Sequence, residues 1–329
     1  MLGIDQQLDY EKFYLYSIIT HSTALEGSTI TEVENQILFD EGISIKGKTM
    51  EEQLMNLDLK SAYEQCLRQA KEPYKFTVDL LTNLAGLVMK NTGKEFKTAL
   101  GDFSSTNGDI RLLNVTTGVG GKSYMNYNKV PAKLREFCEE LNYVRGEIAS
   151  FSLQQKYEWT FDAHFKLVTI HPWADGNGRT ARLIMNLLQF EQGMVPTRLL
   201  KEDREEYIKA LIATRESDDL TIFRRFMTSN MIKNLTHDID VFQESLENES
   251  GLGGKKSEFG RKKKIKSREK IVSLLTETNT LSATAIAVLI GITPKAVEKH
   301  LSKLKAEGML RRIGPDKGGY WEVVRDWKK

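Results

Sequence analysis

Apolar residues recur at helical spacing along most of the first 250 residues. Apolar positions three and four residues apart form one face of a helix, so long runs of this kind predict amphipathic helices. The sequence therefore predicts a mainly α-helical body. Its predicted helices span residues 10–27, 50–70, 76–90, 131–148, 153–170, 180–192, 204–215 and 221–246.

One segment of this body has a pattern typical of β-strands. Residues 110–131, IRLLNVTTGVGGKSYMNYNKVP, combine a β-branched run, a glycine turn and alternating aromatic residues. β-branched and aromatic residues are enriched in strands, and glycine permits a tight turn between them. We expect a short β-hairpin here.

Residues 269–329 predict a small second domain of three short helices and a hairpin. Ser282 can cap one helix, and Gly291 turns the chain after it. Thr293 and Pro294 open the next helix, because proline is favoured at the first helical position, and Gly308 ends it. The segments MLRRI and YWEVV flank GPDKGG as in a β-wing. The pattern resembles a winged helix-turn-helix domain.

Charge divides the chain into an acidic body and a basic end. Residues 251–329 hold 19 Lys or Arg and 8 Asp or Glu, a net charge of +11, whereas residues 1–250 hold 28 and 37, a net charge of −9. The join, NESGLGGKKSEFGRKKKIKSREK, is rich in glycine and basic residues, as linkers are. We expect an N-terminal helical region at 1–95, a core at 96–247, a basic linker at 248–268 and the small domain at 269–329.

Composition narrows the class of protein. Apolar residues make up 40% of the chain and charged residues 28%, the balance of a soluble globular protein. No apolar run is long enough for a membrane span, and the acidic start, MLGIDQQLDYEKF, is unlike a secretory leader. We expect a cytoplasmic protein without a membrane partner. Cys66 and Cys138 have no metal-type spacing, so reduced thiols are expected.

The stretch HPWADGNGRTAR, residues 171–182, concentrates chemically active groups. His171 follows an apolar helix and precedes Pro172, so the chain must enter a loop there. The loop leads into a new helix, whose N-terminus gathers unpaired N–H groups and a partial positive charge. Glycines leave room for a phosphate at such a site. The sequence therefore predicts an anion site; the alternative is a solvated loop with a structural histidine.

The charged residues of this stretch suit a nucleotide. Arg179 and Arg182 are three residues apart and therefore neighbours on the helix, where both guanidinium groups can face one anion. Asp175 can anchor Mg²⁺, which takes few protein ligands when phosphate and water supply the rest. His171 is the candidate base, because imidazole ionises near neutral pH.

The stretch resembles the core motif of the Fic family, H-x-F-x-[DE]-G-N-G-R-x-x-R. It matches every fixed position except that Trp173 stands where phenylalanine is usual. The resemblance implies an all-helical Fic core with a short β-hairpin flap, and transfer of AMP from ATP to a hydroxyl side chain of a target protein. Doc-type kinases of the family carry lysine where this chain has Gly178, so nucleotidyl transfer is favoured over phosphorylation.

The resemblance also assigns roles. His171 would deprotonate the target hydroxyl, and Asp175 would hold Mg²⁺. The implied nucleotide-binding residues are Gly176, Asn177 and Gly178 around the phosphates, Arg179 on the β-phosphate and Arg182 on the γ-phosphate. Residues 118–128 occupy the place of the flap, which grips an extended target segment as an added strand; a plain surface hairpin is the alternative. The implied target-docking residues are Ser123, Tyr124, Met125 and Asn126.

A second motif lies upstream. STALEG, residues 22–27, resembles the inhibitory pattern [ST]-x-x-x-E-[GN] of self-restrained Fic proteins. Its members here are Ser22, Glu26 and Gly27. Glu26 would pair with Arg182, keeping that arginine from the γ-phosphate and repelling the phosphate itself. Local helix packing is the alternative explanation for so short a pattern.

The basic end suits nucleic acid. Lys295, Lys299 and Lys303 would line the exposed face of the recognition helix, and Arg311 and Arg312 would contact phosphates. The alternative is a protein-contact or dimerisation module, since this fold does not by itself imply DNA. Two rivals to a self-inhibited adenylyltransferase therefore stay open. One is a nucleotide-sensing transcriptional regulator, and the other is a Fic enzyme that uses another nucleotide. The identity of the target and a homodimer also stay open.

Overall fold

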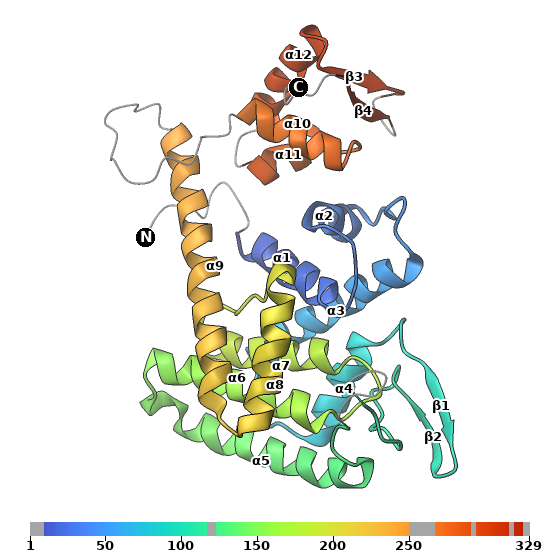
Figure 1. The fold of residues 1–329 in the computed structure, drawn as a ribbon, viewed down its shortest axis with the longest axis vertical. Helices are drawn as coiled ribbons and strands as arrows, with labels where there is room; N and C mark the ends of the chain where they lie inside the picture. The colour runs from blue at the N-terminus through green and yellow to red at the C-terminus, as the bar shows by residue number, and fades with distance from the viewer. Residues whose placement is uncertain (1–9, 117–122, 250–266, 291–293, 316–318, 325–329) are drawn as a thin grey trace. The chain divides into compact units, whose positions relative to one another are not determined.

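Helices dominate the structure, as the spacing of apolar residues predicts (Figure 1). The computed structural model describes residues 10–116, 123–249, 267–290, 294–315 and 319–324. Its chain divides into two compact units, residues 1–234 and 235–329. The only sheets in the described ranges are two antiparallel hairpins. The expected class, mainly α with a small winged-helix domain, is confirmed.

The first unit contains most of the helices and one of the hairpins. Its helices are α1 (Tyr10–Ala24), α2 (Glu32–Glu41), α3 (Met50–Gln69), α4 (Val78–Val88), α5 (Val130–Glu147), α6 (Leu153–Ile170), α7 (Asn177–Glu191), α8 (Arg204–Ser217) and the first part of α9 (Leu220–Glu249). Its strands are β1 (Glu95–Thr98) and β2 (Gly101–Ser104), joined in register from Glu95 opposite Ser104 to Thr98 opposite Gly101.

Helices α6 and α7 form the centre of this unit (Figure 1). Nearly every residue of α7 is buried, polar ones included, which is typical of a helix surrounded by others. α1, α3 and α4 pack on α7, and α5 packs on α6. The loop from His171 to Gly176 joins the two central helices, so the core itself fixes both ends of the predicted site.

Helix α2 was not predicted from the spacing of apolar residues. It depends instead on its ends: the Thr31 side chain accepts from the Glu34 N–H, and the Glu34 carboxylate accepts from the Thr31 N–H. This reciprocal capping box satisfies two N–H groups that the helix cannot pair, and left-handed Gly42 ends the helix.

The β1–β2 hairpin was also missed. Phe96 and Phe103 face each other across it with their rings stacked, centroids 4.8 Å apart. Cross-strand aromatic pairs stabilise sheets. The spacing of these two residues in the sequence does not indicate that they pair, because they become neighbours only when the turn forms. Gly101, at φ +125°, supplies the backbone conformation that this turn requires.

The predicted hairpin at 110–131 is present at its base. Thr116 and Ser123 form an antiparallel bridge, and the Tyr124 N–H donates to the Val115 carbonyl at 3.0 Å. Residues 117–122, the expected turn, lie outside the described residues. The end of the segment differs from the prediction, because residues 127–129 form a 3₁₀ turn that leads directly into α5.

The second unit contains α10 (Ser267–Glu277), α11 (Ala283–Ile290), α12 (Pro294–Ala306) and the β3 (Leu310–Ile313) and β4 (Tyr320–Val323) hairpin. Ser282 caps α11 by accepting from the Ala285 N–H at 3.1 Å, as expected. Pro294 opens α12, and Gly308 follows it at φ +70°. The linker prediction at 248–268, like Gly291 and Thr293, falls mainly on residues outside the described ranges.

Both cysteines are free and buried. Within the described ranges, no helix is long and apolar enough to cross a membrane.

Candidate active site

The loop after α6 is held by its own motif residues. The Asn177 side chain accepts from the Trp173 N–H at 3.0 Å and donates to the Trp173 carbonyl at 2.8 Å. The indole of Trp173 is buried and donates to the Gly108 carbonyl at 2.9 Å. Tryptophan at this position therefore anchors the loop in the core. Both ends of the Asn177 amide are thus used inside the loop.

His171 ends α6 in a left-handed conformation, φ +53°, which is uncommon for a residue other than glycine. Its ring Nδ1 lies 3.3 Å from the Val168 carbonyl, which can only accept, so Nδ1 carries the proton and Nε2 keeps a free lone pair. The ring of Tyr124 stacks on the imidazole with centroids 3.6 Å apart. The guanidinium of Arg215 lies 4.9 Å from the Tyr124 ring centre.

Burial lowers the pKa of His171 to about 4, and the nearby Arg111 and Arg215 cations act in the same direction. The Val168 hydrogen bond and the Glu26 carboxylate oppose this shift. Above the pH of this titration the imidazole is neutral. A neutral imidazole with an available Nε2 is a proton acceptor, the form that a general base needs.

The N-terminus of α7 is open to an anion. Gly176 precedes the helix at φ +81°, and no side chain caps the helix. The first N–H groups of a helix lack partners within it and point outward. A Cβ at Gly178 would lie 2.6 Å from Oε1 of Glu26. A side chain at this position would therefore displace the end of the Glu26 side chain.

Arg179 is a buried arginine with unused donors. Its side chain is 3% exposed, its Nη2 lies 3.1 Å from the Met89 sulfur and 3.5 Å from Asp175 Oδ1. Its Nε and Nη1 have no hydrogen-bond partner. Buried donors are nearly always paired, so these two are candidates to bind an anion.

Arg182, by contrast, is fully engaged. Its Nε donates to the Ser22 hydroxyl at 2.8 Å, and its Nη2 donates to the Ser22 carbonyl at 2.9 Å and to Glu26 Oε1 at 2.6 Å. The arginine side chain is 5% exposed and that of Glu26 is 37% exposed. Although burial opposes ionisation, Arg182 holds the pKa of Glu26 below its usual range. The structure thus brings together the two motifs, whose residues Ser22 and Arg182 are 160 positions apart in the sequence.

The upstream motif extends past the end of its helix, which is shorter than the helix predicted over residues 10–27. Helix α1 ends at Ala24, and the Glu26 N–H bonds back to Thr23 in a tighter turn. Glu26 therefore projects from the turn after the helix, while Ser22 still belongs to the helix. Gly27, at φ +107°, then turns the chain away with open space around it.

A buried polar network holds α1 from behind. Asn56 of α3 accepts from the Thr23 hydroxyl at 2.8 Å and from the Asn35 amide at 2.7 Å, and it donates to Ser28 at 3.2 Å. Asn35 of α2 also donates to Thr20 of α1 at 2.7 Å. Both asparagines are fully buried. This network fixes the register of the helix that carries Ser22.

Comparison with known proteins agrees with these motifs. Residues 75–189 match the model of the Fic/DOC family, and residues 266–311 match that of the winged helix-turn-helix DNA-binding family. Residues 75–189 are therefore similar to the Fic/DOC family. Protein adenylyltransferase fic-1 of Caenorhabditis elegans is 27% identical over 248 residues, which cover 75% of this chain and 45% of the relative. Protein adenylyltransferase Fic of Drosophila grimshawi is 28% identical over 225 residues, covering 66% and 41%.

The chain thus spans less than half the length of these curated relatives. Two solved structures share its fold. Fic-1 of C. elegans, residues 134–508, aligns with a TM-score of 0.57 at 24% identity, covering 72% of this chain and 66% of that one. A Fic family protein from Desulfovibrio desulfuricans G20 aligns with a TM-score of 0.53 at 16% identity, covering 97% and 88%.

The structure brings most of the predicted residues to one place. His171, the α7 terminus with Arg179 and Arg182, and the base of the 110–131 hairpin with Tyr124 all lie around the loop after α6. Sequence reasoning missed Arg111, which binds the His171 carbonyl, and Met89, which lies under Gly176 and Arg179. No local motif indicated either residue.

Asp175 is the exposed member of the motif. Its side chain is 64% exposed, and its Oδ1 accepts from the Gly176 N–H at 2.6 Å. No cluster of three or more metal-ligating side chains occurs in the part of the chain that the structure describes. A single exposed carboxylate at the mouth of a phosphate site nevertheless fits Mg²⁺, which binds proteins through one or two carboxylates and takes its other ligands from phosphate and water.

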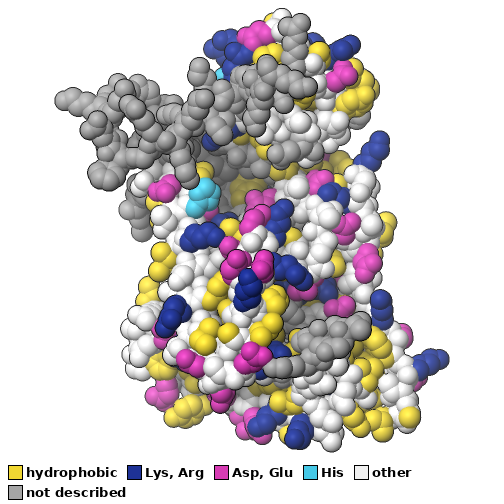
Figure 2. All heavy atoms as spheres, viewed as in Figure 1, with side chains coloured by type: hydrophobic (Ala, Val, Ile, Leu, Met, Phe, Trp, Pro, Cys, Tyr) yellow, Lys and Arg dark blue, Asp and Glu magenta, His cyan; other side chains and the backbone are white. Residues whose placement is uncertain are grey.

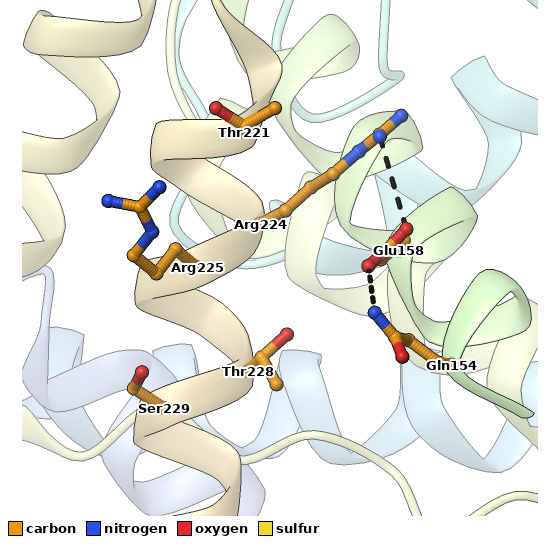
Figure 3. Close-up of a pocket in the computed structure, with 7 residues that line it drawn as sticks. All are labelled: Gln154, Glu158, Thr221, Arg224, Arg225, Thr228 and Ser229. Carbon is orange, nitrogen blue, oxygen red and sulfur yellow. Dashed lines mark hydrogen bonds and ion pairs between the residues drawn. The ribbon is translucent and has the colours of Figure 1, made fainter.

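An open cavity of about 290 Å³, lined by residues of polar and charged types, lies at the far end of α6 from His171 (Figure 3). Its wall is formed by Gln154, Glu158, Thr221, Arg224, Arg225, Thr228 and Ser229. Arg224 already pairs with Asp162 and, at 3.9 Å, with Glu158. Since α6 rises about 1.5 Å per residue, Gln154 lies roughly 25 Å along the helix from His171, and the cavity is separate from the candidate site.

The C-terminal unit exposes the predicted basic residues of α12. Lys295, Lys299 and Lys303 are exposed, while Val297, Leu301 and Leu304 are buried on the other face. Arg311 pairs with Glu322 across the hairpin, and Arg312 lies over the Trp321 ring. Basic side chains are visible on the surface of this unit in Figure 2.

Proposed function

We propose that this protein transfers AMP from ATP to a hydroxyl side chain of a target protein. The observation that carries the proposal is a neutral imidazole beside an uncapped helix terminus flanked by two buried arginines. The curated relatives are named protein adenylyltransferases, which supports the same activity. The phosphates of ATP would lie on the N–H groups that begin α7.

The arginines divide the phosphate contacts. The unpaired Nε and Nη1 of Arg179 would donate to the β-phosphate. Arg182 would bind the γ-phosphate once Glu26 has released it. Asp175 would hold Mg²⁺, which neutralises phosphate charge when bound. Gly178 leaves free the space beside Glu26 and Arg182 that a Cβ would occupy, whereas a Cβ at Gly176 would meet Met89.

His171 would act as the base. Its Nε2 takes the proton of the target hydroxyl, whose oxygen attacks the α-phosphorus. The bond from the α-phosphorus to the bridging oxygen of the β-phosphate breaks, and pyrophosphate leaves with that electron pair. The protein contributes orientation and charge neutralisation rather than a covalent intermediate.

The flap would present the target. Ser123 bridges to Thr116, and the segment through Met125 and Asn126 continues beside the imidazole. An extended segment of the target can add to such an edge as a strand. This pairing would fix the distance and orientation of the target hydroxyl relative to His171. Tyr124 already covers one face of His171, so the flap and the base form one surface.

Glu26 would restrain this activity. Its carboxylate lies over Gly178 and holds Arg182, the position that the γ-phosphate needs. Two anions cannot share that position without strong repulsion in a partly buried site. The inhibitory motif is Ser22, Glu26 and Gly27, with Ser22 holding the same arginine through its hydroxyl and carbonyl.

The donor and the transferred group can be tested with labelled nucleotides. Incubation of the Glu26→Gly variant with Mg²⁺ and ATP labelled at the α-phosphate is expected to label the protein itself and targets in a cell lysate. ATP labelled at the γ-phosphate should give none, because AMP transfer releases pyrophosphate. Label from the γ-phosphate would indicate a kinase instead. Label from UTP but not from ATP would show that another nucleotide is the donor.

A second function is favoured by the C-terminal unit. The match to the winged helix-turn-helix DNA-binding family and the exposed lysine face of α12 support DNA binding through Lys295, Lys299 and Lys303, with Arg311 and Arg312 on phosphates. A nucleotide-sensing regulator would use this unit as its output, but phosphate binding alone does not need the base His171.

For DNA binding we expect a gel shift with random-sequence duplex whose affinity falls about 100-fold or more between ~50 and ~200 mM salt, because bound lysines release counterions. Replacement of Lys295, Lys299 and Lys303 by serine should weaken the shift and flatten its salt dependence. The matched control replaces three exposed lysines of the first unit, Lys75, Lys97 and Lys133. No shift at the lowest salt would favour a protein-contact role.

A further inference from the structure

Arg111 is a fully buried cation whose side-chain donors bind backbone carbonyl groups. Its side chain is 0% exposed. Nε donates to the His171 carbonyl at 2.8 Å, Nη1 to the Leu113 carbonyl at 2.6 Å, and Nη2 to the Met125 carbonyl. Among the described residues, no carboxylate is a hydrogen-bond partner of Arg111. Burial lowers its pKa from the usual value, which reflects the cost of enclosing a charge.

The three carbonyl groups belong to two separate parts of the site. His171 is the base, and the Arg111 N–H donates to the carbonyl of the next residue, Pro172, at 3.0 Å. Leu113 and Met125 lie on the two limbs of the flap segment, on either side of the Thr116 bridge. One guanidinium group therefore ties both limbs of the flap to the catalytic loop.

The contact of Arg111 with Met125 fixes the position of the neighbouring Tyr124 ring. Tyr124 precedes Met125 and stacks on the imidazole at a centroid distance of 3.6 Å. A shift of the Met125 backbone would carry this ring and the flap edge away from the base. The contact with the His171 carbonyl has a matching effect, because it holds a left-handed backbone that a residue other than glycine adopts only when its surroundings enforce it.

We propose that Arg111 is a positioning residue that fixes the distance between His171 and the flap, and so the place at which the target hydroxyl meets the base. This inference rests on the proposed AMP transfer. Arg111 acts through the backbone of His171 and Met125, not on the nucleotide. Its planar fork reaches carbonyl groups in three directions, which the single ammonium group of lysine does not reproduce.

The kinetic test uses the Glu26→Gly protein as parent and adds Arg111→Gln, Arg111→Lys or the control Arg135→Gln. Arg135 is an exposed arginine of α5 and lies outside the site. Arg111→Gln is expected to lower the turnover of self-labelling by about 100-fold, the effect of misplacing reacting groups by about 1 Å. The KM for ATP should stay unchanged. Arg111→Lys is expected to lower this turnover by about tenfold, because lysine keeps the positive charge but does not reproduce the hydrogen-bond geometry of the guanidinium group.

A second readout needs no activity. The Tyr124 ring shifts the carbon-bound protons of the His171 imidazole in the NMR spectrum, and His171→Gln identifies these signals by removing them. Tyr124→Leu gives their position without the ring. Arg111→Gln and Arg111→Lys are expected to move the signals toward that position, whereas Arg135→Gln should not. Circular dichroism melting establishes which variants are folded, and Arg111→Lys serves both readouts if Arg111→Gln is unfolded.

The outcomes distinguish failure of the proposed AMP transfer from failure of the positioning role of Arg111. An unlabelled Glu26→Gly parent would contradict the proposed function, while the NMR signals would still test the position of the flap. Turnover that survives both Arg111 substitutions would overturn the positioning role. The same holds if the His171 signals stay in place, or if turnover and ATP affinity fall in parallel, since that pattern belongs to a nucleotide-binding residue.

Discussion

Replacing Glu26 with glycine is expected to raise AMP transfer by about 100-fold, equivalent to about 2.7 kcal/mol. The substitution removes the carboxylate that bonds Arg182 at 2.6 Å and frees the space over Gly178. Arg182 then becomes available to the γ-phosphate, and a repelling charge is lost. Self-labelling with ATP labelled at the α-phosphate, and calorimetric titration with a non-hydrolysable ATP analogue and Mg²⁺, measure transfer and affinity separately.

Two further variants make this result specific. Glu26→Gln keeps the shape of the side chain without its charge and should give an intermediate rate. Glu41→Gly removes an exposed glutamate from the end of α2 and should change nothing. If Glu26→Gly binds the analogue no better and labels no faster than the unaltered chain, the ion pair with Arg182 is structural rather than inhibitory.

Replacing His171 with alanine in the Glu26→Gly protein is expected to lower transfer by about 1,000-fold, within the range of general-base catalysis. Affinity for the ATP analogue should persist, because the phosphate contacts lie on α7 and its arginines. The matched control is His237→Ala, which removes an exposed histidine of α9. Label that survives the His171 substitution would exclude the imidazole as the base.

The rate of AMP transfer is expected to fall at acidic pH. The pKa of His171 is lowered to about 4, chiefly by burial, so the base form is complete above about pH 5. Transfer should therefore be insensitive to His171 through neutral pH and fall as the pH drops through 4. Glu26 raises this pKa, whereas Arg111 and Arg215 lower it, so the Glu26→Gly protein should titrate at a still lower pH. NMR titration of the His171 ring protons measures the midpoint directly.

The sequence predicted the parts of the fold that rest on local spacing. The helices around α6 and α7 follow the recurrence of apolar residues, and the loop at His171 follows from its proline and glycines. Helix α2 was missed because its capping box, rather than an apolar face, determines its ends. The β1–β2 hairpin was missed because its stabilising pair, Phe96 and Phe103, becomes adjacent only after the turn forms.

The sequence likewise predicted some features of the candidate site and missed others. The resemblance to the inhibitory motif implied Glu26 and Arg182 as partners, and the structure pairs them. The sequence did not predict the internal use of the Asn177 amide, the Tyr124 stack or the role of Arg111. The Tyr124 stack and the role of Arg111 depend on contacts between segments far apart in the sequence. Neither hydrophobic periodicity nor a short motif indicates which distant segments will meet. An isolated arginine before a β-branched run is indistinguishable from a surface residue until the fold encloses it.

The network behind α1 determines how release of Arg182 can occur. Withdrawal of the helix would separate Thr23 and Thr20 from Asn56 and Asn35, leaving buried polar groups unsatisfied at about 1–3 kcal/mol each. Rotation of the Glu26 side chain, which projects beyond the helix end, breaks one partly exposed ion pair. The lower-energy way to separate Glu26 from Arg182 is therefore a change of one rotamer within an otherwise stationary scaffold, in which Ser22 keeps its two bonds to the arginine. A rising concentration of nucleotide can drive that change by competition.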